Sequence, residues 1–166
     1  MTQNDKNLFF MKAAFQEAYK AYLKKEVPVG AVVVLNNQII ARAHNNRKQK
    51  NLFFGHAEFL ALIKANKKLK NRRLTNSSVY VTLEPCLMCA GALIQAGVKH
   101  VYYGAADSKT GCIKSLLTSF ELPLPHKVIA HSGFLAQESS DLLKTFFQQL
   151  RKKDGSKKTK NTSILL

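Results

Sequence analysis

The spacing of apolar residues predicts a helix at the N-terminus and a pair of strands after it. Apolar side chains recur at helical spacing over residues 6–25, the pattern of an amphipathic helix that covers a core. A valine-rich run over 27–35 is followed by the turn-forming pair Asn36-Asn37 and by alternating residues over 38–43. This pattern predicts an antiparallel hairpin.

The middle of the chain predicts a parallel pair of strands. A polar loop over 44–51 precedes a helical pattern over 56–70. A short apolar strand over 78–83, a helix over 86–96 and a second strand over 99–103 then form a β-α-β unit. Strands joined by a helical crossover run parallel, so the sheet combines both strand directions.

The C-terminal third predicts a long loop, a last strand, a helix and a tail. Residues 104–125 are rich in Gly, Ser, Thr and Pro, with a short helix at 115–120. We expect a strand at 126–130 and a helix at 139–151, where apolar residues have helical spacing. The Lys-rich tail at 152–166 is expected to be disordered.

The length of 166 residues suits a single domain, which we assign to residues 1–151. No uncharged apolar run reaches the roughly 18 residues of a membrane-spanning helix, so no membrane partner is expected. The N-terminus lacks the pattern of a secretory leader. We therefore expect a cytoplasmic protein.

The net charge is +16, from 26 Lys and Arg against 10 Asp and Glu. A charge of this size predicts a polyanionic partner, and nucleic acid fits best because each neutralised phosphate releases counterions. A generally basic proteome or a solubilising tail is the competing interpretation. Charge gives the class of partner and does not identify a substrate.

Two short motifs carry the candidate chemistry. One contains His56 and Glu58 in the order H-A-E, and the other contains Cys86 and Cys89 in the order P-C-L-M-C. Structural zinc usually has four protein ligands, whereas catalytic zinc keeps three and leaves one position to water. One His and two Cys therefore predict an open zinc site, with Glu58 placed to carry a proton for the water.

Helix starts explain why these residues can meet. Pro85 suits the first turn of a helix, which places Cys86 and Cys89 on one face at its positive end, where thiolates are favoured. We expect His56 to open a second helix, so that Glu58 points at the open metal position. Such a site supports hydrolytic deamination of an electron-poor amidine, such as C4 of cytosine or C6 of adenine.

Other interpretations explain less of the pattern. A thioredoxin-like dithiol would account for the C-x-x-C and leave His56 and Glu58 without a role. A noncatalytic RNA-binding protein stabilised by zinc would not require Glu58. The third cysteine, Cys112, is interpreted as a small apolar filler in or near a loop.

Five segments, in order, resemble the TadA-type tRNA adenosine deaminases of the zinc-dependent cytidine/deoxycytidylate deaminase superfamily. The resemblance spans about residues 8–151. The segments are Glu26 to Val32, Asn46-Arg47, His56 to Glu58, Tyr80 to Ala92 and Gly104 to Gly111.

This resemblance implies a cytidine deaminase-like fold, a three-layer α/β/α structure with a mixed five-stranded sheet, and a homodimer. It implies one zinc ion on His56, Cys86 and Cys89, with Glu58 as the proton shuttle. The implied reaction converts the wobble adenosine of a tRNA anticodon to inosine, with the anticodon stem-loop as partner. The alternative is a deaminase of a free nucleobase or nucleoside, of the cytosine or guanine type, which the high positive charge disfavours.

The resemblance also suggests substrate contacts. By likeness, Asn46 contacts the flipped base, and the backbone N–H of Ala57 meets the purine edge. The pocket wall is formed by Val29 and Leu83, and Glu84 is a further substrate contact. The loop that handles the neighbouring ribose and phosphates contains Asp107, Ser108 and Lys109, and the helix that borders the anticodon loop contains Phe146, Phe147 and Arg151. Competing interpretations make Asn46 a turn residue, Asp107 a loop cap and the two phenylalanines core residues.

The sequence departs from the family pattern at several positions. Lys48 stands where the family often has Pro, and Ala106 where Arg is common. Ile113 and Lys114 follow Cys112 in place of a run of small residues. These departures lie outside the zinc motifs and bear on the anticodon contacts.

Overall fold

The computed structural model describes residues 1–162 and the side chains of residues 1–153. The elements in chain order are α1 (Gln3–Leu23), β1 (Gly30–Leu35), β2 (Gln38–His44), α2 (Arg47–Lys50), α3 (Ala57–Leu69), β3 (Ser78–Leu83), α4 (Leu87–Ala96), β4 (His100–Ala105), the 3₁₀ helix η1 (Ser119–Glu121), β5 (Ile129–Ser132) and α5 (Ala136–Thr162).

The five strands form one mixed sheet in the order β2-β1-β3-β4-β5. Strand β1 is antiparallel to β2 and to β3, whereas β3, β4 and β5 run parallel to one another. The predicted hairpin, the predicted parallel pair and the predicted fold class are therefore confirmed.

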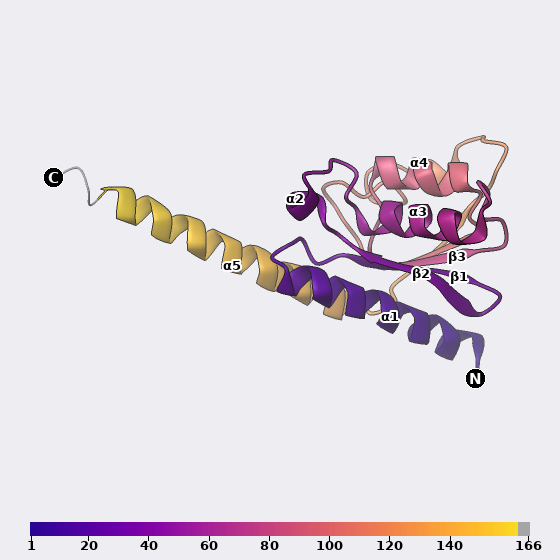
Figure 1. The fold of residues 1–166 in the computed structure, drawn as a ribbon, viewed down its shortest axis with the longest axis horizontal. Coiled ribbons are helices and arrows are strands. Elements are labelled where there is room, and N and C mark those ends of the chain that lie inside the picture. The colour runs from indigo at the N-terminus through magenta and orange to yellow at the C-terminus, as the bar shows by residue number, and fades with distance from the viewer. Residues whose placement is uncertain (163–166) are drawn as a thin grey trace.

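Helices cover both faces of the sheet (Figure 1): α3 and α4 lie on one side, and α1 and α5 on the other. Side chains of a strand alternate between the two faces. In β1, Ala31 and Val33 accordingly pack in the core under α3 and α4, while Val32 and Val34 pack with Phe10 and Met11 of α1. Burial on both faces explains why β1 is an unbroken apolar run.

Gly30 fixes how closely α1 approaches the start of β1. A Cβ atom at this position would lie 2.1 Å from the carbonyl oxygen of Ala14, so no other residue fits. The N–H of Gly30 donates to Oγ1 of Thr82 on β3 at 3.2 Å. These contacts hold together the strand ends that border the candidate site.

Three short elements differ from the sequence prediction. The loop predicted at 44–51 contains α2, the short helix predicted at 115–120 shrinks to η1, and the last strand starts at Ile129 and not at residue 126. Local patterns determine short elements poorly because contacts from distant residues decide them. In α2 that contact is the Glu26 carboxylate, which accepts hydrogen bonds from the backbone N–H groups of Lys48 and Gln49.

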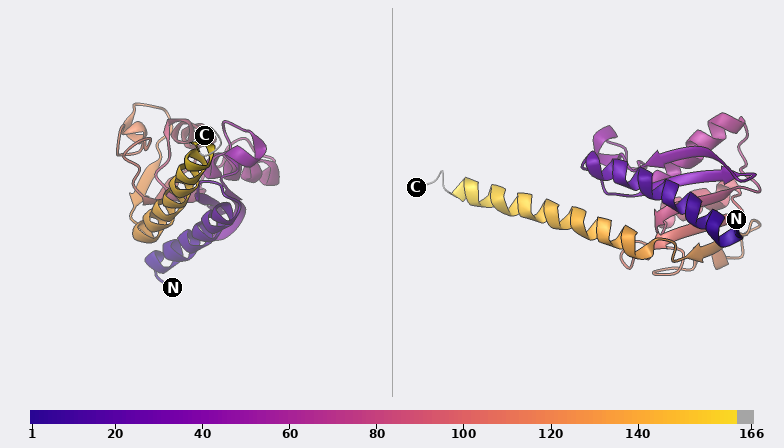
Figure 2. Two further views of the ribbon diagram at one scale, coloured as in Figure 1. Left: turned by 90° about the vertical axis from the view of Figure 1, so that its left-hand side faces the viewer. Right: turned by 90° about the horizontal axis from the view of Figure 1, so that it is seen from below.

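The C-terminus also differs from the prediction of disorder after residue 151. Helix α5 continues through Thr162 and extends away from the body of the protein (Figure 2). Lysine is a good helix former, and adding residues to an existing helix costs little compared with starting one. Residues 163–166 lie outside the described residues, and the domain limit at 151 remains a prediction. No helix within residues 1–162 is both long and apolar enough to cross a membrane.

Candidate active site

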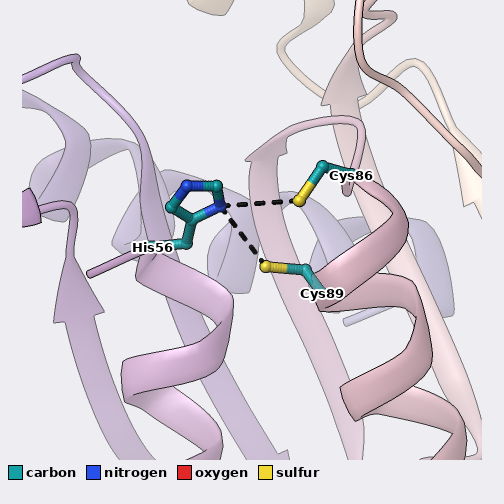
Figure 3. Close-up of side chains that lie close together, drawn as sticks. All are labelled: His56, Cys86 and Cys89. Carbon is teal, nitrogen blue, oxygen red and sulfur yellow. Dashed lines mark hydrogen bonds between the residues drawn. The ribbon is translucent and has the colours of Figure 1, made fainter. Parts of the chain in front are cut away.

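Three side chains meet where the N-terminal ends of α3 and α4 lie side by side (Figure 3). Nδ1 of His56 lies 3.5 Å from Sγ of Cys86 and 3.6 Å from Sγ of Cys89. A tetrahedral zinc ion with usual bond lengths would separate its nitrogen and sulfur ligands by about 3.5–3.6 Å. The donor types and their spacing therefore fit such an ion, and the predicted ligand set is brought together.

Helix capping positions place these three side chains. His56 is the N-cap residue of α3 and Cys86 that of α4, and neither side chain caps its own helix. Cys89 follows within the first turn of α4 and is fully buried. Pro85 precedes the N-cap of α4, which corrects its predicted place in the first helical turn. Its carbonyl oxygen accepts a hydrogen bond from the N–H of Cys112 at 2.9 Å.

The two thiols have very different acidities. Hydrogen bonds from Cys89 and then from His56 lower the pKa of Cys86 to about 4, so its thiolate forms readily. The hydrogen bond to Cys86, together with burial, raises the pKa of Cys89. The pKa of His56 is raised, chiefly by its hydrogen bond to Cys86. Cys86 is thus the residue of the cluster that most readily supplies a thiolate to a cation.

Glu58 lies in the first turn of α3, beside the cluster, with only 4% of its surface exposed. Burial raises the pKa of its carboxyl group. A carboxyl group with a raised pKa can both accept and return a proton near neutral pH. This is the property required of the predicted proton carrier.

A cavity of about 790 Å³ opens onto the cluster. It is bordered by His56, Glu58 and Cys86, and by most of the residues predicted to bind substrate. Those residues are Val29, Ala57, Leu83, Glu84, Asp107, Ser108, Lys109, Phe147 and Arg151. Segments far apart in the sequence therefore converge on one space.

Two predicted substrate residues do not border this cavity. Phe146 is buried, and its ring packs against the rings of Tyr22 and Phe147, which fits a core residue. Asn46 lies between cavity residues Asn45 and Arg47, and its Oδ1 atom is buried without a hydrogen-bond partner within the described part of the chain. An unsatisfied buried oxygen is costly, and the contact of Asn46 with the base stays a prediction.

Glu84 has a structural role in the fold, and its contact with substrate stays a prediction. Its carboxylate accepts hydrogen bonds from the backbone N–H groups of Asp107, Ile113, Lys114 and Ser115, at 2.8–3.1 Å, and from the Ser115 hydroxyl. Burial alone would raise the pKa of Glu84, but these hydrogen bonds lower it overall. Glu84 therefore organises the loop that borders the cavity.

Asp107 also shapes this loop. Its carboxylate accepts hydrogen bonds from the N–H groups of Lys109 and Thr110, at 2.9 and 3.2 Å, and from the Thr110 hydroxyl at 2.5 Å. This is the pattern of a turn-capping Asp. These contacts fit the interpretation of Asp107 as a loop cap. The side chains of Ser108 and Lys109 are exposed and border the cavity.

Several residues on α5 and in the β2–α2 loop border the cavity although the sequence patterns did not indicate them. Lys144 and Gln148 border the cavity together with Phe147 and Arg151. Phe147, Gln148 and Arg151 follow Lys144 by three, four and seven residues, which places all four on one face of the helix. This spacing could have identified Lys144 and Gln148 from the sequence. Asn45 was not indicated by a local pattern, and its Nδ2 donates to the carbonyl oxygen of Val27, 18 residues away.

Helix N-termini that present a His-Cys-Cys group and a buried Glu to a cavity, over a mixed five-stranded sheet, define the deaminase class of proteins. Residues 4–151 match the model of the MafB19-like deaminase family, and the chain belongs to this family.

Relatives match along most of the chain. A tRNA-specific adenosine deaminase of Bacillus subtilis is 46% identical over 154 residues, which cover 92% of this chain and 94% of that protein. A tRNA-specific adenosine deaminase of Rickettsia felis is 42% identical over 144 residues, covering 85% of this chain and all of that protein. The resemblance inferred from the sequence motifs is thereby confirmed.

Solved structures agree with this assignment. One from a study of A-to-I editing by tRNA:A34 deaminases has a TM-score of 0.79 and 40% sequence identity, covering 81% of this chain and 99% of that chain. A guanine deaminase of Bacillus subtilis has a TM-score of 0.58 and 27% identity, covering 75% and 88%. Both similarity measures are higher for the tRNA:A34 deaminase.

Proposed function

We propose that this protein hydrolytically deaminates the wobble adenosine of a tRNA anticodon to inosine. The observation that carries the chemistry is the buried Glu58 beside the group of His56, Cys86 and Cys89, all at one cavity. The substrate assignment is supported by relatives of 42–46% identity that are tRNA-specific adenosine deaminases.

The metal in this proposal is zinc. His56 supplies a borderline nitrogen ligand and Cys86 and Cys89 supply soft sulfur ligands, a set that suits zinc better than magnesium or calcium. A zinc ion held here would act as a Lewis acid and would make water acidic enough to lose a proton near neutral pH. Three protein ligands keep the fourth position free for this chemistry.

Glu58 moves the proton. Its carboxylate takes a proton from the attacking water as the oxygen adds to C6 of adenine, and returns a proton to the departing amino nitrogen. The C–N bond then breaks, and the products are inosine and ammonia. Because Glu58 is buried, bulk water does not compete for the proton in transit.

The base is held by groups at the start of α3 and in the loop before it. The first N–H groups of a helix have no acceptor within the helix, so the N–H of Ala57 is free to donate to the purine edge. Oδ1 of Asn46 can accept a hydrogen bond from the base. Val29 and Leu83 form apolar walls of the cavity.

The RNA around the target base meets the rim of the cavity. Lys109, Lys144 and Arg151 are exposed cations at the rim, suited to phosphates, and Phe147 is 40% exposed, as a stacking surface requires. By likeness to its relatives, we infer that the protein acts as a homodimer in the cytoplasm, where it meets tRNA.

The test incubates purified, zinc-loaded protein with an anticodon stem-loop that carries adenosine at the wobble position. Free adenosine, cytidine and guanine are assayed in parallel, and inosine in the RNA is measured by nuclease digestion and chromatography. We expect inosine only at the wobble position. Deamination of a free compound with no reaction on the RNA would replace this function with that of a nucleobase or nucleoside deaminase.

A further inference from the structure

One segment of the chain is strongly basic because it contains almost no acids. Between Val27 and Leu83, ten Lys and Arg residues occur with a single carboxylate, Glu58, which is buried. By contrast, α1 carries the acids Asp5 and Glu17, and the first turns of α5 carry Glu138 and Asp141.

Seven exposed cations of this segment lie on α2, β2 and α3, and we name this surface the basic flank. Its members are Arg42, Arg47, Lys48, Lys50, Lys64, Lys67 and Lys68. Strand β2 is an edge strand of the sheet, and α3 packs over it. The Nζ atom of Lys64 donates to the carbonyl oxygen of Arg42 at 2.8 Å, which joins the strand and helix parts of the flank.

The basic flank begins at the active-site cavity. Arg47 borders the cavity, and α3 starts at the ligand His56 and leads away from it. With a rise of 1.5 Å per residue, Lys64 lies roughly 12 Å along α3 from His56, and Lys68 roughly 18 Å. The flank therefore extends from the site of reaction across the outside of the protein.

Among the side chains that the structure describes, no carboxylate forms an ion pair with the seven residues of the flank. Within residues 1–152, both ion pairs involve Glu17, which contacts Lys20 and His44. Glu26 lies next to α2, but it is 3% exposed and its oxygens accept the backbone N–H groups of Lys48 and Gln49. Like charges gathered in this way repel one another and attract a polyanion.

We propose that the basic flank binds the sugar–phosphate backbone of the RNA stem adjoining the nucleotide that enters the cavity. This inference rests on the proposed function, because it takes an RNA substrate at the cavity as its starting point. An RNA stem presents phosphates continuously along its length, so RNA engaged at the cavity can reach cations farther along α3. Such contacts position the substrate without reading its sequence.

The test compares two double variants that remove the same charge. Lys64→Gln/Lys68→Gln alters one face of α3, whereas Lys6→Gln/Lys12→Gln alters α1 on the opposite side of the sheet. Binding of a fluorescent anticodon stem-loop is measured by anisotropy over a range of salt concentrations, and KM and kcat are measured for inosine formation. Melting temperatures establish that both variants are folded.

For the flank variant we expect a higher KM at unchanged kcat. The slope of log affinity against log salt should become shallower by about 0.7–0.9 for each phosphate that the variant no longer neutralises. The α1 variant should behave as wild type. A loop-only oligonucleotide should bind both variants and wild type equally, because the flank contacts the stem.

Two results would overturn the inference: a flank variant identical to wild type, or equal effects from the flank and α1 variants, which would reflect net charge alone. Failure of the proposed function has a different outcome. If wild type forms no inosine but its binding to the stem-loop still depends on Lys64 and Lys68, the basic flank is an RNA-binding surface and the proposed reaction is wrong.

Discussion

The carboxylate of Glu26 caps α2 in place of Asn46, the residue at the N-cap position. An N-cap Asn usually accepts a hydrogen bond from the second or third N–H group of its helix. Here those groups belong to Lys48 and Gln49, and both donate to Glu26. Oδ1 of Asn46 is thereby left buried and without a partner in the described part of the chain, and in the proposed function its partner is the base.

Replacing Asn46 with Ala should therefore impair catalysis more than folding. The Oδ1 atom has no hydrogen bond to the described residues that the substitution could remove, so the melting temperature should change little. Removal of one hydrogen bond to the base, at about 1–3 kcal/mol, corresponds to a decrease in kcat/KM of roughly 5- to 160-fold. Single-substrate kinetics on the stem-loop and a thermal melt measure the two effects.

The neighbouring Asn45 is the matched control. Its Nδ2 donates to the carbonyl oxygen of Val27 at 3.2 Å, and its Oδ1 accepts from the N–H of Arg47 at 3.1 Å. Asn45→Ala should destabilise the fold by about 1–2 kcal/mol. Equal loss of stability in the Asn45 and Asn46 variants would contradict the ligand-binding role of Asn46.

Glu58→Gln should retain the metal and the fold and lose deamination. The amide is nearly the same size as the carboxyl group but cannot carry the proton, and general acid–base catalysis contributes about 10²–10⁴-fold to such reactions. Metal content by atomic spectroscopy and single-turnover inosine formation are the measurements. Full activity in this variant would show that another group moves the proton.

Cys86→Ala should lower both the zinc content and the rate, because it removes one of three ligands. Cys112→Ala is the control for cysteine removal, since Cys112 is buried outside the three-residue group. We expect about one zinc per chain in wild type and in the Cys112 variant. Unchanged stoichiometry in the Cys86 variant would exclude Cys86 as a ligand.

Local sequence patterns predicted the fold and the meeting of His56, Cys86 and Cys89 because each depended largely on neighbours along the chain. His56, Cys86 and Cys89 sit at helix starts that short motifs reveal, and the β-α-β unit that carries the two cysteines has a regular apolar pattern. Glu26 and Glu84 were different. Their carboxylates organise loops that lie about twenty to thirty residues away, and such contacts leave no periodic trace.

Glu17 provides a test of how acid affects the fold. Its carboxylate lies 2.6 Å from Nζ of Lys20 and 3.0 Å from Nδ1 of His44, and so it links α1 to the edge strand β2. Burial alone would raise the pKa of Glu17, but the hydrogen bonds from Lys20 and His44 lower it below its ordinary value of about 4.5. Since the folded state favours the ionised form, this contribution to stability is present above the unfolded pKa and disappears as the pH falls through the folded pKa.

The variant Glu17→Gln should therefore be less stable than wild type at pH 7, by about 1–3 kcal/mol for the charged hydrogen bonds that it removes. The difference should narrow below about pH 4.5 and vanish in stronger acid, where the wild-type carboxyl group is also neutral. Denaturant unfolding from pH 3 to 7 measures it, with the exposed Glu138→Gln on α5 as the control that should follow wild type. A stability difference as large at pH 3 as at pH 7 would mean that the packing of the Glu17 side chain, and not its charge, stabilises the contact between α1 and β2.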